Sequence, residues 1–320
     1  MNTTKTTECS IVASVFNEHE GIEAFYKELS ATMETLQISY EILFVNDGSR
    51  DNSLELLKAI AENDAHVKVV DFSRNYGHEA AMIAGIDHSA GNFVICMDSD
   101  LQHPPVSIPQ IKEKMDEGYD VVTMVRKKRE DASVFQEFRS RTFYKILNKM
   151  SDVTLDENAS DFFAISKRVV AILQTDYRER TRFLRGIIQT VGFKKTSIEY
   201  VAQKRFAGKS NYSFFKLLKL SLAAISSFSK LPLQIGVVTG LFFMFASVLL
   251  LIYSLVMWIL NTPISGYTTL VVALCAFAGI QLFVMGIIGI YISYIFDEIK
   301  GRPIYLVNTV ISKSTENEEK

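Results

Sequence analysis

The segment Phe93-Val94-Ile95-Cys96-Met97-Asp98-Ser99-Asp100-Leu101-Gln102 decides the fold class of this 320-residue chain. Its first five residues are apolar and predict a fully buried strand, which then ends in two carboxylates. Asp98 and Asp100 are two positions apart, so both side chains fall on one face of an extended chain. Paired carboxylates in this position are suited to hold Mg²⁺ or Mn²⁺. The alternative is a solvated turn, because Asp and Ser are common turn residues.

Strands and helices alternate on both sides of this segment. The predicted strands are Ser10–Val15, Glu41–Val45, Val67–Asp71, Phe93–Met97 and Val121–Val125, and the predicted helices lie at about 18–36, 54–60 and 77–88. Such alternation predicts an α/β fold with a mostly parallel, Rossmann-like sheet. Neither a G-x-G-x-x-G nor a G-x-x-x-x-G-K-[ST] motif follows any of these strands, so dinucleotide and P-loop sites lack their sequence signature.

Polar residues follow the carboxyl ends of several predicted strands. They are Asn17, Asp47, Arg74 and Asp98. In open α/β sheets, ligands bind at this edge. We therefore expect these side chains to form one site.

The C-terminal third has a different composition. No charged residue occurs from Leu233 to Leu260 or from Thr268 to Ile295, and each stretch is long enough to cross about 30 Å of hydrocarbon. Two such stretches in tandem rarely fit a soluble core, so we expect two transmembrane helices. Lysines precede the first stretch, and Lys300 and Arg302 follow the second. The positive-inside rule then places both termini in the cytoplasm and the short connecting loop outside.

This composition divides the chain into four predicted parts: a cytoplasmic α/β domain at 1–212, a juxtamembrane amphipathic helix at 213–232, two transmembrane helices at 233–296 and a cytoplasmic tail at 297–320. A second basic amphipathic helix is predicted at 133–150, with a composition suited to an anionic membrane surface. The polar N-terminus does not resemble a signal peptide, and the three cysteines show no disulfide or zinc spacing. We expect a multi-pass protein of the inner (plasma) membrane.

Five ordered motifs carry a family resemblance. They are Ala13-Ser14-Val15-Phe16-Asn17-Glu18, Asn46-Asp47-Gly48-Ser49, Arg74-Asn75-Tyr76-Gly77-His78, Asp98-Ser99-Asp100-Leu101-Gln102 and Arg205-Phe206-Ala207-Gly208-Lys209-Ser210. With the two apolar stretches, they make the chain resemble family 2 glycosyltransferases of the GT-A fold. Within that family it looks like a polyprenyl-phosphate glycosyltransferase of the bactoprenol glucosyltransferase type, related to dolichyl-phosphate mannose synthase.

The resemblance implies an inverting transfer of one sugar from a nucleotide-sugar to a polyprenyl phosphate, giving a lipid-linked sugar for cell-surface glycans. UDP-glucose and undecaprenyl phosphate are the favoured substrates. Carried over to this chain, the family pattern gives the following roles: Asn17 and Asp47 bind the nucleoside, Asp98, Asp100 and Gln102 bind Mg²⁺ or Mn²⁺ with the diphosphate, and Arg74, Arg126, Arg205 and Lys209 bind substrate. Asp161 falls where the family has its proposed base.

A phosphate monoester is already largely dianionic near neutral pH, so it needs no further deprotonation to act as a nucleophile. Our hypothesis is that Asp161 orients a basic side chain or the sugar more than it abstracts a proton. Arg180, Arg182 and Arg185 are expected to form a helix face with salt bridges rather than a site.

The chain departs from the family pattern at three positions. Ser14 replaces a usual Pro, His103 replaces a usual Asp, and Asn211 replaces a common Lys. His103 puts a metal-binding or helix-capping role at that position in doubt. None of the three departures removes the paired carboxylates.

Several alternatives stay open from the sequence. One is a non-catalytic membrane scaffold that binds sugar nucleotides, and another is a related transferase for mannose or an aminosugar. A processive synthase would carry a Q-x-x-R-W motif, whose nearest match is Arg182-Phe183-Leu184-Arg185-Gly186. Small residues at Gly279, Gly286 and Gly289 favour a homo-oligomer. We expect no nucleic-acid partner.

Overall fold

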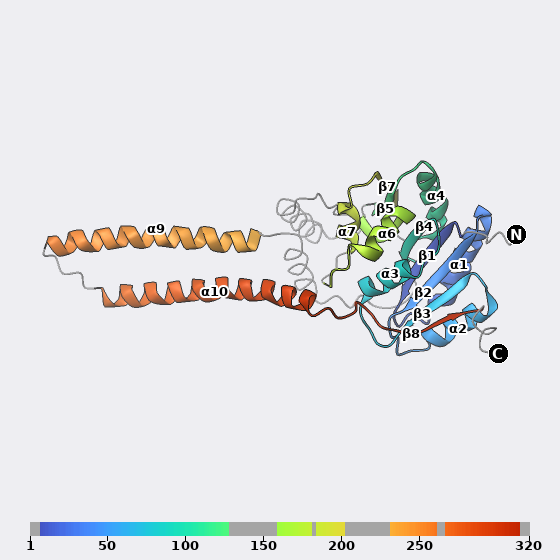
Figure 1. Ribbon diagram of the computed structural model, residues 1–320, viewed down its shortest axis with the longest axis horizontal. Coiled ribbons are helices and arrows are strands. Elements are labelled where there is room, and N and C mark those ends of the chain that lie inside the picture. Colours follow the sequence, from blue (N-terminus) through green and yellow to red (C-terminus); the bar gives the residue numbers. More distant parts are fainter. Residues whose placement is uncertain (1–6, 128–158, 181–183, 202–230, 261–265, 314–320) are drawn as a thin grey trace. The chain divides into compact units, whose positions relative to one another are not determined.

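The computed structural model describes residues 7–127, 159–180, 184–201, 231–260 and 266–313 (Figure 1). The chain divides into two compact units. The first unit combines the N-terminal α/β part with residues 303–320, and the second contains the intervening residues 214–302. The amphipathic helix predicted at 133–150 lies outside the described residues. So does the one predicted at 213–232, apart from Leu231 and Pro232, which begin the helix α9.

Within the described residues, the first unit is built on an eight-stranded sheet in the order β7-β5-β6-β4-β1-β2-β3-β8. The strands are β1 (Cys9–Val15), β2 (Tyr40–Asn46), β3 (Val67–Phe72), β4 (Phe93–Asp98), β5 (Val121–Arg126), β6 (Ala159–Ser166), β7 (Lys195–Tyr200) and β8 (Val307–Ser312). Strands β3, β2, β1 and β4 are parallel neighbours, and β5 and β7 form a second parallel pair. Strand β6 runs antiparallel between β4 and β5, and β8 runs antiparallel to β3. The predicted α/β fold with a mostly parallel sheet is confirmed.

Helices cover both faces of this sheet. They are α1 (Ile22–Leu36), α2 (Ser53–Asn63), α3 (His78–Asp87), α4 (Ile108–Asp116), α6 (Lys167–Thr175) and α7 (Leu184–Thr190). Apolar side chains of α1, α2 and α4 share one core with Ile11 and Phe44. Helix α3 lies on the opposite face, where Gly85 packs directly against Val12 of β1. Residues Ala80–Ile86 are all buried, because α3 also packs against α6.

The C-terminal strand β8 was not predicted from the sequence, which gave residues 297–320 as a separate tail. In the structure, Val307–Ser312 pairs with β3 and forms the edge of the sheet. Asn308 strengthens this pairing, since its Nδ2 donates to Asp71 Oδ2 at 2.9 Å. Pairing with β8 satisfies backbone groups that β3 would otherwise expose as an edge strand. Part of the predicted tail therefore belongs to the eight-stranded sheet.

The second unit contains two long helices, α9 (Leu231–Ile259) and α10 (Tyr267–Ile299). Gly236–Met257 and Val272–Ile299 are long and apolar enough to cross a membrane. The helices lie side by side (Figure 1), and the Phe243 and Phe277 rings contact each other edge-to-face with centroids 5.3 Å apart. Most of their described apolar side chains are exposed, as expected for helices that face lipid.

Candidate active site

The carboxyl edge of the sheet collects most of the described polar residues that the sequence singles out. Asn17, Asp47 and Arg74 follow β1, β2 and β3, while Asp98 ends β4. Strand β6 runs the other way, so its beginning rather than its end lies at this edge. This direction brings Asp161, the third residue of β6, to the same place as Asp98.

The Asp98–Asp100 segment is held in place by His103. The backbone N–H of Asp98 donates to His103 Nδ1 at 2.9 Å, and the imidazole stacks on Phe162 with centroids 5.2 Å apart. His103 is 1% exposed, and its burial lowers the pKa, so the ring is neutral near pH 7. Because Nδ1 already accepts a hydrogen bond from the Asp98 backbone N–H, it is not available to a metal. His103, which replaces the family's Asp, therefore supports the carboxylate pair by holding the Asp98 backbone.

His78, the first residue of α3, contacts three parts of the site. Its Nδ1 lies 2.8 Å from the Ser14 hydroxyl oxygen, and its Nε2 lies 3.6 Å from Asp98 Oδ1 and 3.9 Å from Asp161 Oδ2. Burial alone would lower the pKa of His78, but the charges of Asp98 and Asp161 raise it overall. The ring therefore connects Asp98 with Asp161. Ser14, where the family usually has Pro, supplies the hydroxyl that fixes it.

Asp161 forms a bidentate ion pair with Arg185 of α7. Arg185 Nε donates to Asp161 Oδ1 at 3.1 Å, and Nη2 donates to Oδ2 at 2.7 Å. Burial would raise the pKa of Asp161, but the charge and hydrogen bonds of Arg185 hold it below the usual range. Both side chains are about one-quarter exposed, at 24% for Arg185 and 26% for Asp161. The pair therefore stays accessible from the site.

Glu79 joins α3 to the start of α7. Its Oε2 accepts the Leu184 N–H at 2.9 Å, which fixes the residue that precedes Arg185. Burial, helped by the nearby Asp161 carboxylate, raises the pKa of Glu79 to about 7.

Asp47 lies in a buried position and holds the turn that follows β3. Its carboxylate accepts the backbone N–H groups of Tyr76 and Gly77 at 2.6 and 3.0 Å, and Asn75 Nδ2 donates to it at 2.9 Å. Burial raises the pKa of Asp47, against the effect of these donors. Gly48 has φ +65° and sits so close to the Arg74 backbone that a Cβ would collide with it. The Asp47 motif and the Arg74 motif therefore form one rigid loop pair.

The remaining predicted site residues lie at the rim of this edge. Asn17 is exposed with φ 55°, and its Oδ1 accepts the Arg50 N–H at 2.8 Å. Arg74 is exposed and lies over the Tyr76 ring, 4.2 Å from its centroid. Arg126 Nη2 lies 3.4 Å from Gln102 Oε1, so it meets the predicted metal-binding segment. Arg205 and Lys209 lie outside the described residues.

The donor atoms at this edge fit a hard divalent cation. Asp98 and Asp100 present carboxylate oxygens and Gln102 an amide oxygen, which are the ligands that Mg²⁺ and Mn²⁺ prefer. Asp98 is about one-third exposed, with 32% of its side chain accessible. Among the described residues, no group of three or more His, Cys, Asp and Glu side chains could by itself hold a metal ion. A metal held here would complete its coordination with water or substrate oxygens.

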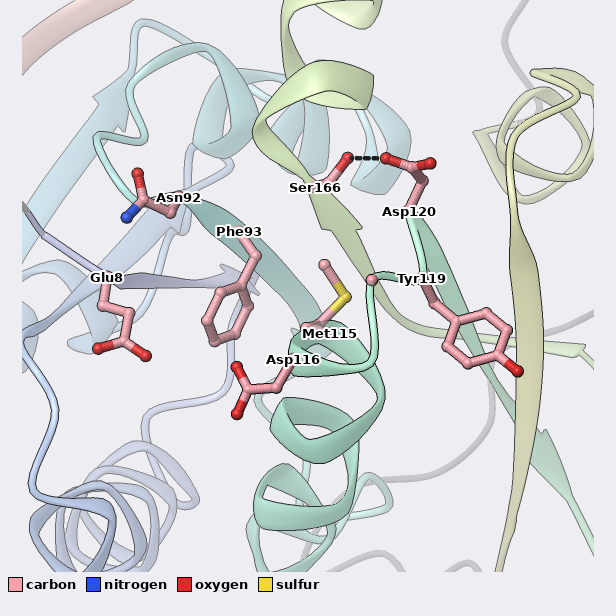
Figure 2. A pocket seen from close by; sticks show the side chains of 9 residues that line it. Glu8, Asn92, Phe93, Met115, Asp116, Tyr119, Asp120 and Ser166 are labelled. Carbon is pink, nitrogen blue, oxygen red and sulfur yellow. Dashed lines mark hydrogen bonds between the residues drawn. The ribbon is translucent and has the colours of Figure 1, made fainter.

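A separate hollow lies at the opposite edge of the sheet (Figure 2). It is lined by Phe93 at the start of β4, by Asp120 just before β5 and by Ser166 at the end of β6. Ser166 Oγ donates to Asp120 Oδ1 at 2.8 Å across its wall. The described residues that were predicted for function lie at the other end of the strands.

Sequence reasoning missed the supporting residues of the site. The roles of His78 and Glu79 were not predicted, and Ser14 and His103 were noted only as departures. Arg185 was expected in a salt bridge on a helix face, but not in the site. The available signal was position: His78 is the last residue of the Arg74 motif, which follows β3. Arg185 carried no comparable signal, because its partner Asp161 lies on a strand that the pattern did not reveal.

Comparisons with known proteins identify the family of this chain. Residues 10–172 match the model of glycosyl transferase family 2. The chain is 39% identical over 305 residues to the uncharacterized glycosyltransferase YkcC of Bacillus subtilis, covering 93% of this chain and 92% of the relative. It is 38% identical over 302 residues to the SfII prophage-derived bactoprenol glucosyl transferase of Shigella flexneri, covering 93% and 96% of the two chains. The prophage bactoprenol glucosyl transferase homolog of Escherichia coli K12 is 39% identical over 309 residues, with 94% and 98% covered. The chain belongs to glycosyl transferase family 2 and is a glycosyltransferase.

Proposed function

We propose that this protein transfers one sugar, glucose, from a uridine diphosphate sugar to a polyprenyl phosphate at the cytoplasmic face of the membrane. The observation that carries the proposal is the combination of the carboxylate site at the sheet edge with two apolar helices in the same chain. A soluble acceptor would need no such helices. Relatives named bactoprenol glucosyl transferases, aligned over almost the whole chain, support the lipid acceptor and the glucose.

Negative charge develops on the nucleoside diphosphate as it leaves the donor sugar, and the site must stabilise this charge. Asp98, Asp100 and Gln102 would hold Mg²⁺ or Mn²⁺, which would neutralise the charge that develops on the leaving diphosphate. The chain contributes the rigid placement of these groups: His103 holds the Asp98 backbone, and Asp100 Oδ1 accepts the Gln102 N–H at 3.0 Å. Arg126, beside Gln102, adds a cationic group at the same place.

The nucleoside side of the site is formed by the loops after β1 and β2. Asn17 is exposed there, and the Ser49 hydroxyl accepts its N–H at 3.0 Å, which ties the two loops together. Asp47 shapes the adjoining turn through its buried hydrogen bonds. We propose that this pair of loops binds the nucleoside, with Arg74, Arg205 and Lys209 contributing to substrate binding.

The acceptor is a phosphate monoester that is largely dianionic at neutral pH, so the reaction needs positive charge more than a strong base. Asp161 does not resemble an activated base here, because both of its oxygens accept hydrogen bonds from Arg185. A carboxylate with a lowered pKa is also a weak proton acceptor. These contacts support an orienting role for Asp161.

The experiment uses purified full-length protein in lipid, a panel of radiolabelled nucleotide-sugars and undecaprenyl phosphate, with and without EDTA. We expect a lipid-linked monosaccharide from UDP-glucose, and loss of the product when EDTA removes the metal. A product from another donor would replace glucose but keep the reaction class. Failure of every donor, while UDP still binds, would contradict the proposal and favour a sugar-nucleotide-binding scaffold.

A further inference from the structure

The Asp161–Arg185 pair has a well-defined geometry, and the family resemblance gave Arg185 no role. Arg185 approaches Asp161 side-on through Nε and Nη2, with both distances within hydrogen-bonding range. The backbone beside it is fixed as well, because Leu184 N–H donates to Glu79. A guanidinium that is paired with a carboxylate and carried on a fixed backbone loses little further rotational freedom when it binds a ligand.

The charges around this pair give it a role beyond structural support. His78 Nε2 lies between Asp98 and Asp161, so the two carboxylates belong to one cluster at the sheet edge. Asp100 and Glu79 add two further carboxyl groups close by. A doubly charged phosphate that approaches such an edge is repelled unless fixed cations compensate. Arg185 is a cationic side chain within this cluster, and 24% of its side chain remains accessible.

We propose that Arg185 is a phosphate-binding residue of the transfer reaction and that Asp161 is the residue that positions it. Arg185 binds phosphate oxygens at the reacting centre, either those of the acceptor monoester or those of the donor diphosphate. Arginine suits this task because its planar fork binds a carboxylate along one edge and phosphate oxygens with the N–H groups that point elsewhere. The inference rests on the proposed function, since it assumes a phosphate acceptor and a nucleotide donor.

The chain offers a matched control for this pair. Arg178 forms an equally close bidentate pair with Asp87, at 2.8 and 3.0 Å, where α3 ends. That pair lies at the C-terminal end of α3, whereas His78 and the site lie at its N-terminal end. Arg178→Gln therefore removes the same type of ion pair without removing a charge from the site. We expect it to lower stability and to leave both KM values unchanged.

The test measures initial rates of the full-length protein in lipid, varying polyprenyl phosphate and nucleotide-sugar in turn. Arg185→Gln should lower kcat/KM by about 10²–10³-fold, the usual loss on removing a positioned charge-stabilising donor. A rise in KM for polyprenyl phosphate assigns the acceptor, and a rise in KM for nucleotide-sugar assigns the donor diphosphate. Arg185→Lys should recover part of the loss, because it restores the charge without the planar fork.

A double-mutant cycle tests whether Asp161 acts through Arg185. If the two residues form one unit, Asp161→Asn and Arg185→Gln should each cause a similar loss, and the double variant should be little worse than either. An Asp161→Asn loss that is far larger and adds to that of Arg185→Gln would overturn the positioning role. An unchanged kcat/KM for both substrates in Arg185→Gln would overturn the phosphate contact.

Binding without turnover separates this inference from the proposed function. Equilibrium binding of UDP and of undecaprenyl phosphate is measured for the wild type, Arg185→Gln and Arg178→Gln. Weaker binding of one ligand by Arg185→Gln alone supports the inference even if no donor of the panel is turned over. Equal binding of both ligands by all three proteins contradicts it.

Discussion

His103 shows how a single buried side chain fixes the geometry of the carboxylate pair. Its Nδ1 accepts the Asp98 N–H at 2.9 Å, and the ring is almost completely buried against Phe162. Removing only the acceptor of such a hydrogen bond lowers the stability of the protein most, because the donor left behind is then buried and unpaired. The position therefore tolerates an acceptor of similar reach better than an apolar ring of similar size.

We predict that His103→Phe lowers the free energy of unfolding by about 1–3 kcal/mol, since it leaves the Asp98 N–H unpaired. It should also raise the Mg²⁺ or Mn²⁺ concentration needed for half-maximal activity, because the Asp98 side chain loses its fixed placement. His103→Asn is the matched variant, since its Oδ1 can accept the same N–H. Urea unfolding and metal titrations of activity compare the two. Equal losses in both variants would show that ring packing, rather than the hydrogen bond, is responsible.

Glu79 gives the protein a predictable pH dependence. Its pKa in the folded state is about 7, above the ordinary value of 4.5, so folding favours the protonated form. This contribution to stability is fully present below about pH 4.5 and is lost as the pH rises through about 7. We predict that Glu79→Gln removes this loss of stability at rising pH. Glutamine resembles the protonated side chain and can still accept the Leu184 N–H.

The measurement is the free energy of unfolding of the wild type and of Glu79→Gln at several pH values in metal-free buffer. Relative to the variant, the wild type should lose up to about 1.4 kcal/mol per pH unit between about pH 5 and 7, the limit for one proton. Parallel curves over this range would mean that Glu79 is ionised in the folded protein near pH 5.

At the scale of elements, helix α3 positions much of the site, and its contact with β1 depends on one glycine. A Cβ at Gly85 would overlap the Val12 side chain. We predict that Gly85→Ala destabilises the protein, because overpacking costs about 1–3 kcal/mol while the gain in helix propensity is about 1 kcal/mol. Val12→Ala should relieve the clash, so the double variant should lose less than the sum of the two single losses. Strict additivity in urea unfolding would show that α3 shifts freely on β1.

Elements with a local sequence pattern could be predicted, whereas elements that depend on distant pairing could not. Strand β4 was predicted because five apolar residues precede Asp98, and α3 because it follows a strand at the expected spacing. The helix predicted from Glu18 begins only at Ile22, since Asn17 has a positive φ and a turn follows it. Strand β6 is apolar too, but sequence alone does not reveal that it runs antiparallel between β4 and β5. Without that direction, only the family resemblance pointed to Asp161, and the salt bridge expected for Arg185 could not be assigned to this partner.

Strand β8 illustrates a limit of another kind. Five of its six residues pair with β3, from which they are separated by more than two hundred residues, including both apolar helices. Sequence patterns reveal that a stretch favours extended structure, but not which distant edge it joins. The pairing of β3 with β8 also restricts how the whole chain can be arranged across a membrane.

At the scale of the whole molecule, the pairing of β3 with β8 restricts the membrane topology. Both strands belong to one sheet, so both must lie on the same side of a membrane. The chain between them must then cross the membrane an even number of times. Helices α9 and α10, which are long and apolar enough to cross a membrane, would supply two crossings, and this number agrees with the lysine and arginine at their ends. We therefore predict that the sheet and the C-terminus are cytoplasmic and that residues 261–265 lie outside.

Cysteine labelling tests this topology. The described Cys9 and Cys96 are buried, and Cys275 lies within an apolar stretch, so the unsubstituted protein should react little with a membrane-impermeant maleimide. In intact spheroplasts, Ser265→Cys should be labelled, whereas Thr315→Cys should be labelled only after permeabilisation. The reverse pattern would place the active site outside, away from cytoplasmic nucleotide-sugars. Labelling of neither position before permeabilisation would mean that the helices do not cross the membrane. The pairing of β3 with β8 would still be possible, because zero is also an even number of crossings.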